Sequence, residues 1–294
     1  MLFLPAKRSE SRVLNPPIIV RRAAAAVTIG ETDACGRFGV TADLRTFAAL
    51  GVRGAVVQTF VAGSPLDEFY LREQLYALQR GLNFDALKVA RIGAAAAIRF
   101  VAEQLSESNP PRVTVDASML DSYGSPRIGD AAVDAWKKHL LPMAELVVVN
   151  AIEGERLFGR RVESKRDQLD VVKRLYDLGP TACLVTGGRL QGLPIDLYFD
   201  GTGTIEFGGD RVEGARLPYT GGVLTAAIVA LRARGVAMLP ALERSRAFVN
   251  LSLVGAASHF PHGAAVEPMV EAYRAMDLDD RPVEVEVEVI DEAN

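Results

Sequence analysis

The feature that most constrains the fold is the alternation, from Ala23 onward, of short apolar runs and longer amphipathic segments. Continuous apolar runs are typical of strands that lie in a parallel sheet with both faces covered. The alternation therefore predicts an α/β fold with helices on both faces of a mainly parallel sheet. The expected strands are Ala24–Ile29, Ala55–Val61, Ala86–Val89, Val113–Asp116, Leu146–Asn150 and Ala182–Thr186.

The longer segments place apolar residues at helical spacing, which predicts amphipathic helices between the strands. The expected helices are Gly39–Leu50, Phe69–Gly81, Ala94–Ser106, Ala131–His139, Gln168–Leu178, Gly222–Arg234 and Leu242–Ser258. The pattern changes between Pro194 and Arg216, where alternating residues flank Asp200-Gly201. That arrangement is a hairpin signal and predicts an antiparallel strand pair at one edge of the sheet.

The two ends of the chain carry opposite charges. Residues 277–294 hold eight acidic side chains against one arginine, and residues 1–22 hold five basic side chains against one glutamate. We expect residues 1–22 to be an N-terminal extension, residues 23–276 to form a single domain and residues 277–294 to form an acidic tail. Strict alternation over residues 283–290 indicates an edge strand. The charged ends are either solvated or bind each other or a neighbouring subunit.

Composition and charge argue against several classes of protein. No uncharged run approaches the ~20 residues of a membrane helix, and the N-terminus lacks the order of a secretory signal. There is no basic stripe for nucleic acid. Two cysteines, Cys35 and Cys183, and three histidines argue against a disulfide framework or a structural zinc site. We therefore expect a cytoplasmic protein with a small-molecule ligand, no nucleic-acid or membrane partner and no metal held directly by side chains.

Four segments place glycine or polar residues after predicted strands, where open α/β sheets bind ligands. They are residues 28–43, Asn150-Ala-Ile-Glu153, Thr186-Gly187-Gly188 and Thr220-Gly221-Gly222. The first is a glycine-rich turn that leads into a helix, but it is neither a dinucleotide fingerprint nor a P-loop.

Two of the other three segments have two interpretations. Asn150 and Glu153 could organise Mg²⁺ through water or cap the following helix. The paired glycines after Thr186 let the backbone approach a ligand closely. The small residues from Thr220 either open an anion site at a helix N-terminus or serve close helix packing.

Taken in order, these segments resemble the hydroxymethylpyrimidine/phosphomethylpyrimidine kinases of thiamine biosynthesis, which belong to the ribokinase-like superfamily. That family opens T-I-A-G-x-D-P-S-G-G-A-G-I-Q-A-D-L-K-T, and residues 28–46 match it without a gap. The identical positions are Thr28, Ile29, Asp33, Gly36, Gly39, Ala42, Asp43, Leu44 and Thr46. Later matches are Val115, Asp116 and Met119 with V-x-D-P-V-M, Asn150 and Glu153 with N-x-x-E, Gly187-Gly188 with K-G-G, and Thr220-Gly221 with G-T-G-C. The likeness spans about residues 27–268.

The resemblance implies a ribokinase-like three-layer α/β/α domain, usually in a homodimer. It also implies transfer of the γ-phosphate of ATP, with Mg²⁺, to the hydroxymethyl group of an aminopyrimidine. By this likeness the nucleotide would meet Asn150, Glu153, Thr186, Gly187 and Gly188. The substrate pocket would include Asp43, Ser64 and Arg91, and the backbone of Thr220, Gly221 and Gly222 would form the anion hole.

The sequence departs from the family at positions that carry chemistry. Gly222 stands where the family has cysteine, so no side chain can act there as a general base. The other departures are Tyr219 for the first glycine of G-T-G-C, Ser64 for the glutamine that reads the pyrimidine, Thr186 for lysine, Arg91 for the methionine of K-I-G-M-L and Ala117 for proline. Arg91 suits a carboxylate or phosphate on a ligand, or it fills the pocket. The alternatives are a pyrimidine kinase of doubtful activity, a pseudokinase that binds a ligand or has a regulatory role, and a kinase for a different small alcohol.

Overall fold

The computed structural model describes residues 22–61, 63–121, 124–209 and 220–259. From Ala23 onward, the described residues belong to one compact unit. The predictions for residues 1–21, for Tyr219 and for the acidic tail with its strand at 283–290 lie outside the described residues.

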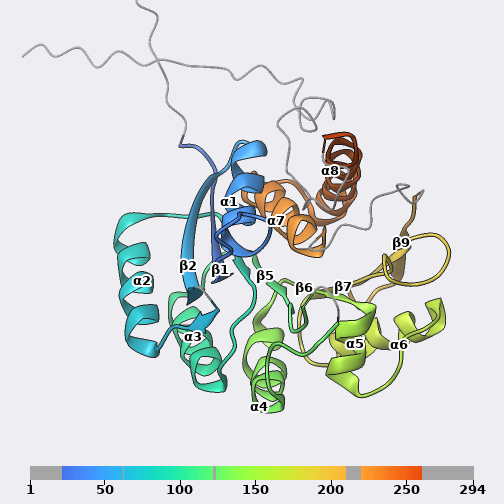
Figure 1. Cartoon of the computed structure of the whole chain (residues 1–294), viewed down its shortest axis with the longest axis horizontal. Coiled ribbons are helices and arrows are strands. Elements are labelled where there is room, and N and C mark those ends of the chain that lie inside the picture. Colours follow the sequence, from blue (N-terminus) through green and yellow to red (C-terminus); the bar gives the residue numbers. More distant parts are fainter. Residues whose placement is uncertain (1–21, 62, 122–123, 210–219, 260–294) are drawn as a thin grey trace, which may run out of the picture. The chain divides into compact units, whose positions relative to one another are not determined.

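The unit is built on one mixed sheet with strand order β3-β2-β1-β4-β5-β6-β7-β8-β9 (Figure 1). The strands are β1 Ala25–Glu31, β2 Arg53–Val61, β3 Ser64–Pro65, β4 Ala86–Val89, β5 Val113–Asp116, β6 Leu146–Asn150, β7 Ala182–Thr186, β8 Asp196–Phe199 and β9 Thr204–Phe207. The six strands β2, β1 and β4 to β7 run parallel, while β3, β8 and β9 pair antiparallel with their neighbours. The carboxyl ends of the parallel strands therefore meet at one edge of the sheet.

Helices cover both faces of this sheet and form the outer two layers. The helices are α1 Gly39–Ala49, α2 Glu68–Gly81, α3 Ala95–Ser108, α4 Asp130–Ala135, α5 Ala151–Phe158, α6 Lys165–Tyr176, α7 Thr220–Ala233 and α8 Met238–His259. Helices α1, α7 and α8 pack on one face, and α2 to α6 lie on the other (Figure 1). Helix α7 is buried on nearly all sides, because it contacts α1, α8 and the sheet together.

The predicted α/β fold with a mainly parallel sheet is confirmed. Strands β4 to β7 have the predicted bounds, and the hairpin around Asp200-Gly201 forms β8 and β9 at the sheet edge. The predicted helix Ala131–His139 is interrupted, because α4 passes into a π-helical turn at Trp136–Leu140. Trp136 is fully buried there and donates from Nε1 to the Ile92 carbonyl at 3.3 Å.

Among the helices of the described residues, none is both long enough and apolar enough to cross a membrane.

Candidate functional site

A buried lysine joins two of the four predicted site segments to the end of β5. Lys88, in the central strand β4, places Nζ 2.7 Å from Asp43 Oδ1 and 3.4 Å from Asp116 Oδ2. The same Nζ donates to the Gly222 carbonyl at 3.0 Å. The lysine side chain is only 2% exposed. Lys88 therefore links α1, the end of β5 and the first turn of α7 through contacts of a single ammonium group.

The strand register explains how this cluster is positioned. Thr28 lies beside Lys88 across the β1–β4 pair. Its hydroxyl donates to Asp43 Oδ2 at 2.6 Å, so Asp43 is held by both strands. Burial alone would lower the pKa of Lys88, but the charges of Asp43 and Asp116 outweigh it and raise the pKa. The lysine is therefore a fixed cation.

Asn150 and Glu153 form a reciprocal capping box at the start of α5. The Asn150 side chain accepts from the Glu153 N–H at 3.0 Å, and Glu153 Oε2 accepts from the Asn150 N–H at 2.9 Å. The capping alternative for this pair is therefore realised. Burial, with the charge of Asp116 as a second cause, raises the pKa of Glu153 to about 8. Glu153 thus carries a proton through most of the neutral range.

The paired glycines follow β7 in a loop that neighbouring side chains hold in place. Thr186 lies opposite Asn150 across the β6–β7 pair. The Gly187 N–H donates to Asp196 Oδ1 at 2.9 Å, and Arg246 of α8 binds the other oxygen of that carboxylate. A Cβ on Gly187 would lie 2.0 Å from the Ile195 carbonyl oxygen, whereas a Cβ on Gly188 would have nothing within 4 Å. Glycine is therefore required at position 187 by close backbone approach.

The first turn of α7 consists of Thr220, Gly221 and Gly222. The first N–H groups of a helix have no partner within the helix, so this turn offers donors to an anion. Among the described residues, a Cβ on Gly221 would have no atom within 4 Å, and one on Gly222 would have only Lys88 Nζ, at 4.0 Å. The position where the family has cysteine thus faces the buried ammonium.

Arg91 is the centre of a second ionic cluster beside the first. Its Nη1 lies 2.5 Å from Glu31 Oε1, and both side chains are buried. Its other nitrogens donate to the carbonyls of Ser118 at 3.0 Å and Leu120 at 2.7 Å. The second carboxylate oxygen of Glu31, Oε2, lies 3.4 Å from Arg127 Nη2. Arg91 therefore binds a carboxylate and two carbonyls of the protein itself.

Glu31 stands where the family motif T-I-A-G has glycine, five positions before the aligned Gly36 of the turn. The two departures, glutamate for glycine and Arg91 for methionine, are distant in sequence but contact each other. Because a buried charge without a partner is strongly unfavourable, each of these residues explains the presence of the other.

The structure brings most predicted site residues to the carboxyl edge of the sheet. Asp43, Arg91, Asn150, Thr186 and the α7 turn all lie at or beside the ends of β1 and β4 to β7. Ser64 differs, because it lies exposed in the short edge strand β3 and pairs with Val61.

Three residues of the site were missed by sequence reasoning, namely Lys88, Asp116 as an ion-pair partner and Glu31. A lysine inside the apolar run Ala86–Val89 was the available signal for Lys88. Its partners at positions 43, 116 and 222 are too distant in sequence to be inferred from spacing.

The described residues fit a nucleotide better than a directly held metal. Among the described residues, none crowds a Cβ added at Gly188 or Gly221, which is compatible with phosphate at these two backbone segments. Among the described residues, no group of three histidine, cysteine or acidic side chains is arranged to hold a metal ion. A Mg²⁺ ion would therefore depend mainly on phosphate oxygens and water, as this ion commonly does.

The strand order, the two helical layers and the glycine-opened helix α7 define a ribokinase-like α/β/α protein. The profile of the family described as Phosphomethylpyrimidine kinase matches residues 33–269. The chain belongs to that family.

Three relatives illustrate the range of the likeness. The hydroxymethylpyrimidine/phosphomethylpyrimidine kinase of Rhizobium meliloti is 30% identical over 246 residues, covering 79% of this chain and 91% of that protein. The chloroplastic thiamine biosynthetic bifunctional enzyme TH1 of Arabidopsis thaliana is 28% identical over 84% of this chain, which spans 49% of that enzyme. The Staphylococcus aureus pyridoxal kinase, solved with AMP-PCP and pyridoxal, superimposes with a TM-score of 0.71 at 26% identity. The superposition covers 79% of this chain and 88% of that one.

Proposed function

We propose that this protein binds ATP with Mg²⁺ on a small-molecule kinase fold but phosphorylates hydroxymethylpyrimidine poorly or not at all. The observation that carries the proposal is the buried Glu31–Arg91 ion pair, which stands where the family has glycine and methionine. Two readings of the activity follow. One is a kinase for a different small alcohol, and the other is a pseudokinase with a binding or regulatory role.

Nucleotide binding is supported by groups that do not depend on side-chain identity. The N–H groups of Thr220, Gly221 and Gly222 belong to the first turn of α7, at the positive end of the helix dipole. The Gly187–Gly188 loop is held by Asp196, which is itself held by Arg246. Lys88 fixes the first turn of α7 through the Gly222 carbonyl. When bound, Mg²⁺ would neutralise charge on the phosphates.

Proton transfer is the step that this chain supports least. The alcohol must lose a proton as phosphate is transferred, and Gly222 has no group to accept it. Lys88 is buried, and the carboxylates of Asp43 and Asp116 raise its pKa, so it stays charged and cannot act as a base. Glu153 titrates near neutral pH, but its Oε2 accepts from the Asn150 N–H. We therefore expect turnover of hydroxymethylpyrimidine to be slower than in an intact relative by at least ~10².

Substrate selection is the second altered property. Arg91 and Glu31 fill space with a paired charge where an apolar wall would accept a neutral ring. Ser64, at the position of the pyrimidine-reading glutamine, is exposed at the sheet edge. Both features support a ligand other than hydroxymethylpyrimidine.

The base position is tested by restoring it. Gly222→Cys and Gly222→Asp should fit, because among the described residues only Lys88 Nζ comes within 4.0 Å of a Cβ there. Each variant is assayed with ATP–Mg²⁺ and several hydroxymethyl heterocycles, with Gly221→Ala as the control in the same turn. Gain of turnover in either variant identifies the missing base as the limiting loss. Normal turnover of hydroxymethylpyrimidine by the unaltered protein would refute the proposal.

The pocket is tested by replacing the ion pair with the family residues. Glu31→Gly/Arg91→Met removes both charges, whereas either single change leaves a buried charge that costs about 3–5 kcal/mol. The double variant should be more stable than each single variant to guanidinium unfolding. It should also gain hydroxymethylpyrimidine binding by titration calorimetry. A loss in the double variant equal to the sum of the two single losses would show that the two residues are not coupled.

The pseudokinase reading predicts ATP binding without phosphate transfer to any tested alcohol. Titration calorimetry with ATP–Mg²⁺ and a coupled ADP assay separate the two readings. A homodimer, as the family resemblance implies, is tested in the same samples by sedimentation velocity. Failure to bind ATP, ADP or phosphate at millimolar concentration would contradict both readings, because each requires an open anion site.

A further inference from the structure

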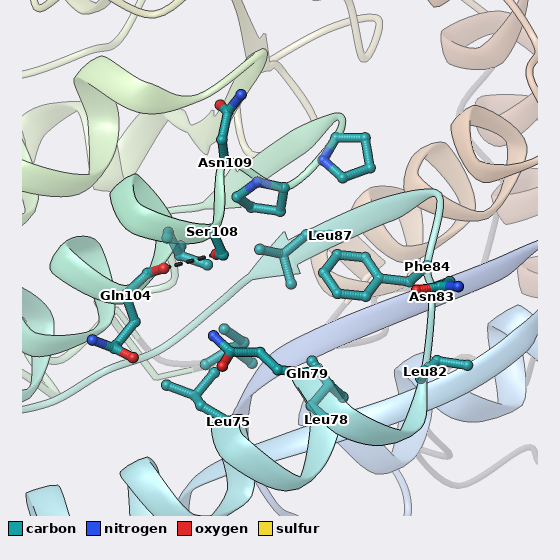
Figure 2. Close-up of a pocket in the computed structure, with 14 residues that line it drawn as sticks. Leu75, Leu78, Gln79, Leu82, Asn83, Phe84, Leu87, Gln104, Ser108 and Asn109 are labelled. Carbon is teal, nitrogen blue, oxygen red and sulfur yellow. Dashed lines mark hydrogen bonds between the residues drawn. The ribbon is translucent and has the colours of Figure 1, made fainter.

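A cavity of about 250 Å³ lies on the face of the sheet that α2 to α6 cover, between the C-terminal halves of α2 and α3 (Figure 2). Ile29 of β1 and Leu87 of β4 contribute to its lining from the sheet, and Leu75 and Leu78 line it from α2. Leu82 and Phe84, in the loop that precedes β4, also line the cavity. Leu105 of α3 lines it as well, so the apolar part of the lining comes from β1, β4, α2 and α3 and from the loops before β4 and β5.

The cavity is separate from the site at the carboxyl edge. Its loop residues 82–84 and 109–111 precede β4 and β5, whereas Asp116 and Asn150 end β5 and β6. Because these strands are parallel, residues before them and residues after them lie at opposite edges of the sheet. A compound in the cavity would therefore not compete with a ligand at the α7 turn.

The lining has a distinct chemical character. Of the described residues that line the cavity, none is acidic or basic, although α2 and α3 carry exposed charges such as Arg80 and Glu107. The polar lining groups are uncharged, and four of them are the carboxamides of Gln79, Asn83, Gln104 and Asn109. A charged ligand would therefore find no counter-ion among the lining side chains. Carboxamides donate and accept hydrogen bonds, so they suit an uncharged polar group.

The wall made by residues 109–111 is held in an unusual backbone conformation. Asn109 and Arg112 have φ of 43° and 50°, and they are the non-glycine residues with positive φ in the described part of the chain. Pro110 and Pro111 lie between them and restrict the loop further. Arg112 also donates to the Asp85 carbonyl at 3.0 Å, which ties this loop to the one before β4. Backbone strain of this kind is commonly retained where it shapes a binding site.

We propose that this cavity is a second small-molecule site, which binds an uncharged compound built on one aromatic ring with a carboxamide-like substituent. The size agrees with this class, because a dry cavity of about 150 Å³ accepts benzene and this one, at about 250 Å³, has room for a ring with one polar substituent. The ring covers Leu75, Leu78 and Leu87, whose apolar surface lines the cavity, and the polar group meets the carboxamide side chains.

The test uses benzamide as the probe, with benzoate and benzylamine as charged compounds of similar shape. Binding is followed by methyl NMR of leucine- and isoleucine-labelled full-length protein, with and without saturating ATP–Mg²⁺. We expect saturable shifts for Leu78, Leu87 and Ile29 with benzamide, unchanged by ATP–Mg²⁺. Both charged probes should bind at least about tenfold more weakly, since the cavity offers no counter-ion.

Two variants decide whether the shifts report the cavity. Leu78→Trp fills the cavity and should abolish the shifts. Ser108→Trp, at an exposed lining position, should also abolish them, and it leaves the half-buried Leu78 unchanged. Tyr76→Trp, on an exposed position of the same helix outside the lining, is the matched control and should bind normally. The proposal is overturned if benzamide gives no saturable shift, if benzoate binds equally well, or if ATP–Mg²⁺ displaces benzamide. It is also overturned if binding survives Ser108→Trp.

Discussion

Replacing Lys88 by methionine is the most direct test of how the functional site is held together. Methionine keeps the length and apolar stem of the lysine but removes the ammonium. The loss leaves the carboxylates of Asp43 and Asp116, whose side chains are 2% and 8% exposed, without their cation. Breaking a buried ion pair from one side typically costs about 3–5 kcal/mol. The Gly222 carbonyl also loses a donor, so the first turn of α7 should loosen.

The assay is guanidinium unfolding at pH 7.5, in which the free energy of unfolding is compared between variants. Lys165→Met is the matched control, because Lys165 pairs with Glu206 on the surface, where both side chains are about half exposed, at 55% and 45%. A surface pair contributes about 0–1 kcal/mol, so the control should change stability little. Lys88→Met/Asp43→Asn should recover part of the loss, because it removes one of the two buried charges. If Lys88→Met costs no more than Lys165→Met, the cluster does not stabilise the site.

Two further predictions follow from the paired glycines and from Glu153. Gly187→Ala should lower stability by about 1–3 kcal/mol because its Cβ meets the Ile195 carbonyl, while Gly188→Ala should stay within about 0.5 kcal/mol. Thermal unfolding of the two variants, with and without ATP–Mg²⁺, checks both values, and equal losses would contradict the crowding argument. Glu153 keeps its proton to about pH 8 when folded but ionises near its ordinary value of 4.5 when unfolded. Its contribution to stability is therefore full below 4.5 and falls by up to ~1.4 kcal/mol per pH unit as the pH rises toward 8. In metal-free buffer Glu153→Gln should remove that slope relative to the native protein, whereas Glu163→Gln at the surface should retain it.

The fold was predictable because its signals are local. The apolar runs of β4 to β7 have the predicted bounds, since such runs fit strands covered on both faces. Helix α6 begins at Lys165 rather than Gln168, because Ser164 and Asp167 form a capping box that the apolar spacing alone does not include. Strand β1 likewise extends to Glu31, two residues beyond the apolar run. Its last side chain is held by Arg91, which a local pattern cannot reveal.

The candidate site was predictable in its backbone but not in its charges. Gly187 marks a close approach to the Ile195 carbonyl, and Gly221 and Gly222 open helix α7. Each such signal lies within a few residues. Lys88, by contrast, gains its meaning from Asp43, Asp116 and Gly222, which the fold brings together from three other elements. Charged partners of this kind become visible only when the sheet order is known.

Glu31 and Arg91 show why departures from a family pattern are best interpreted in pairs. Considered alone, an arginine in an apolar wall suggests a new anionic ligand, and a glutamate in place of glycine suggests a lost turn. Their contact changes both interpretations, because Arg91 binds Glu31 and two carbonyls of the 118–120 segment. Either substitution without the other would leave a buried charge, which is strongly unfavourable. The present arrangement pairs both charges, so the two departures from the family pattern act as one unit rather than as independent changes.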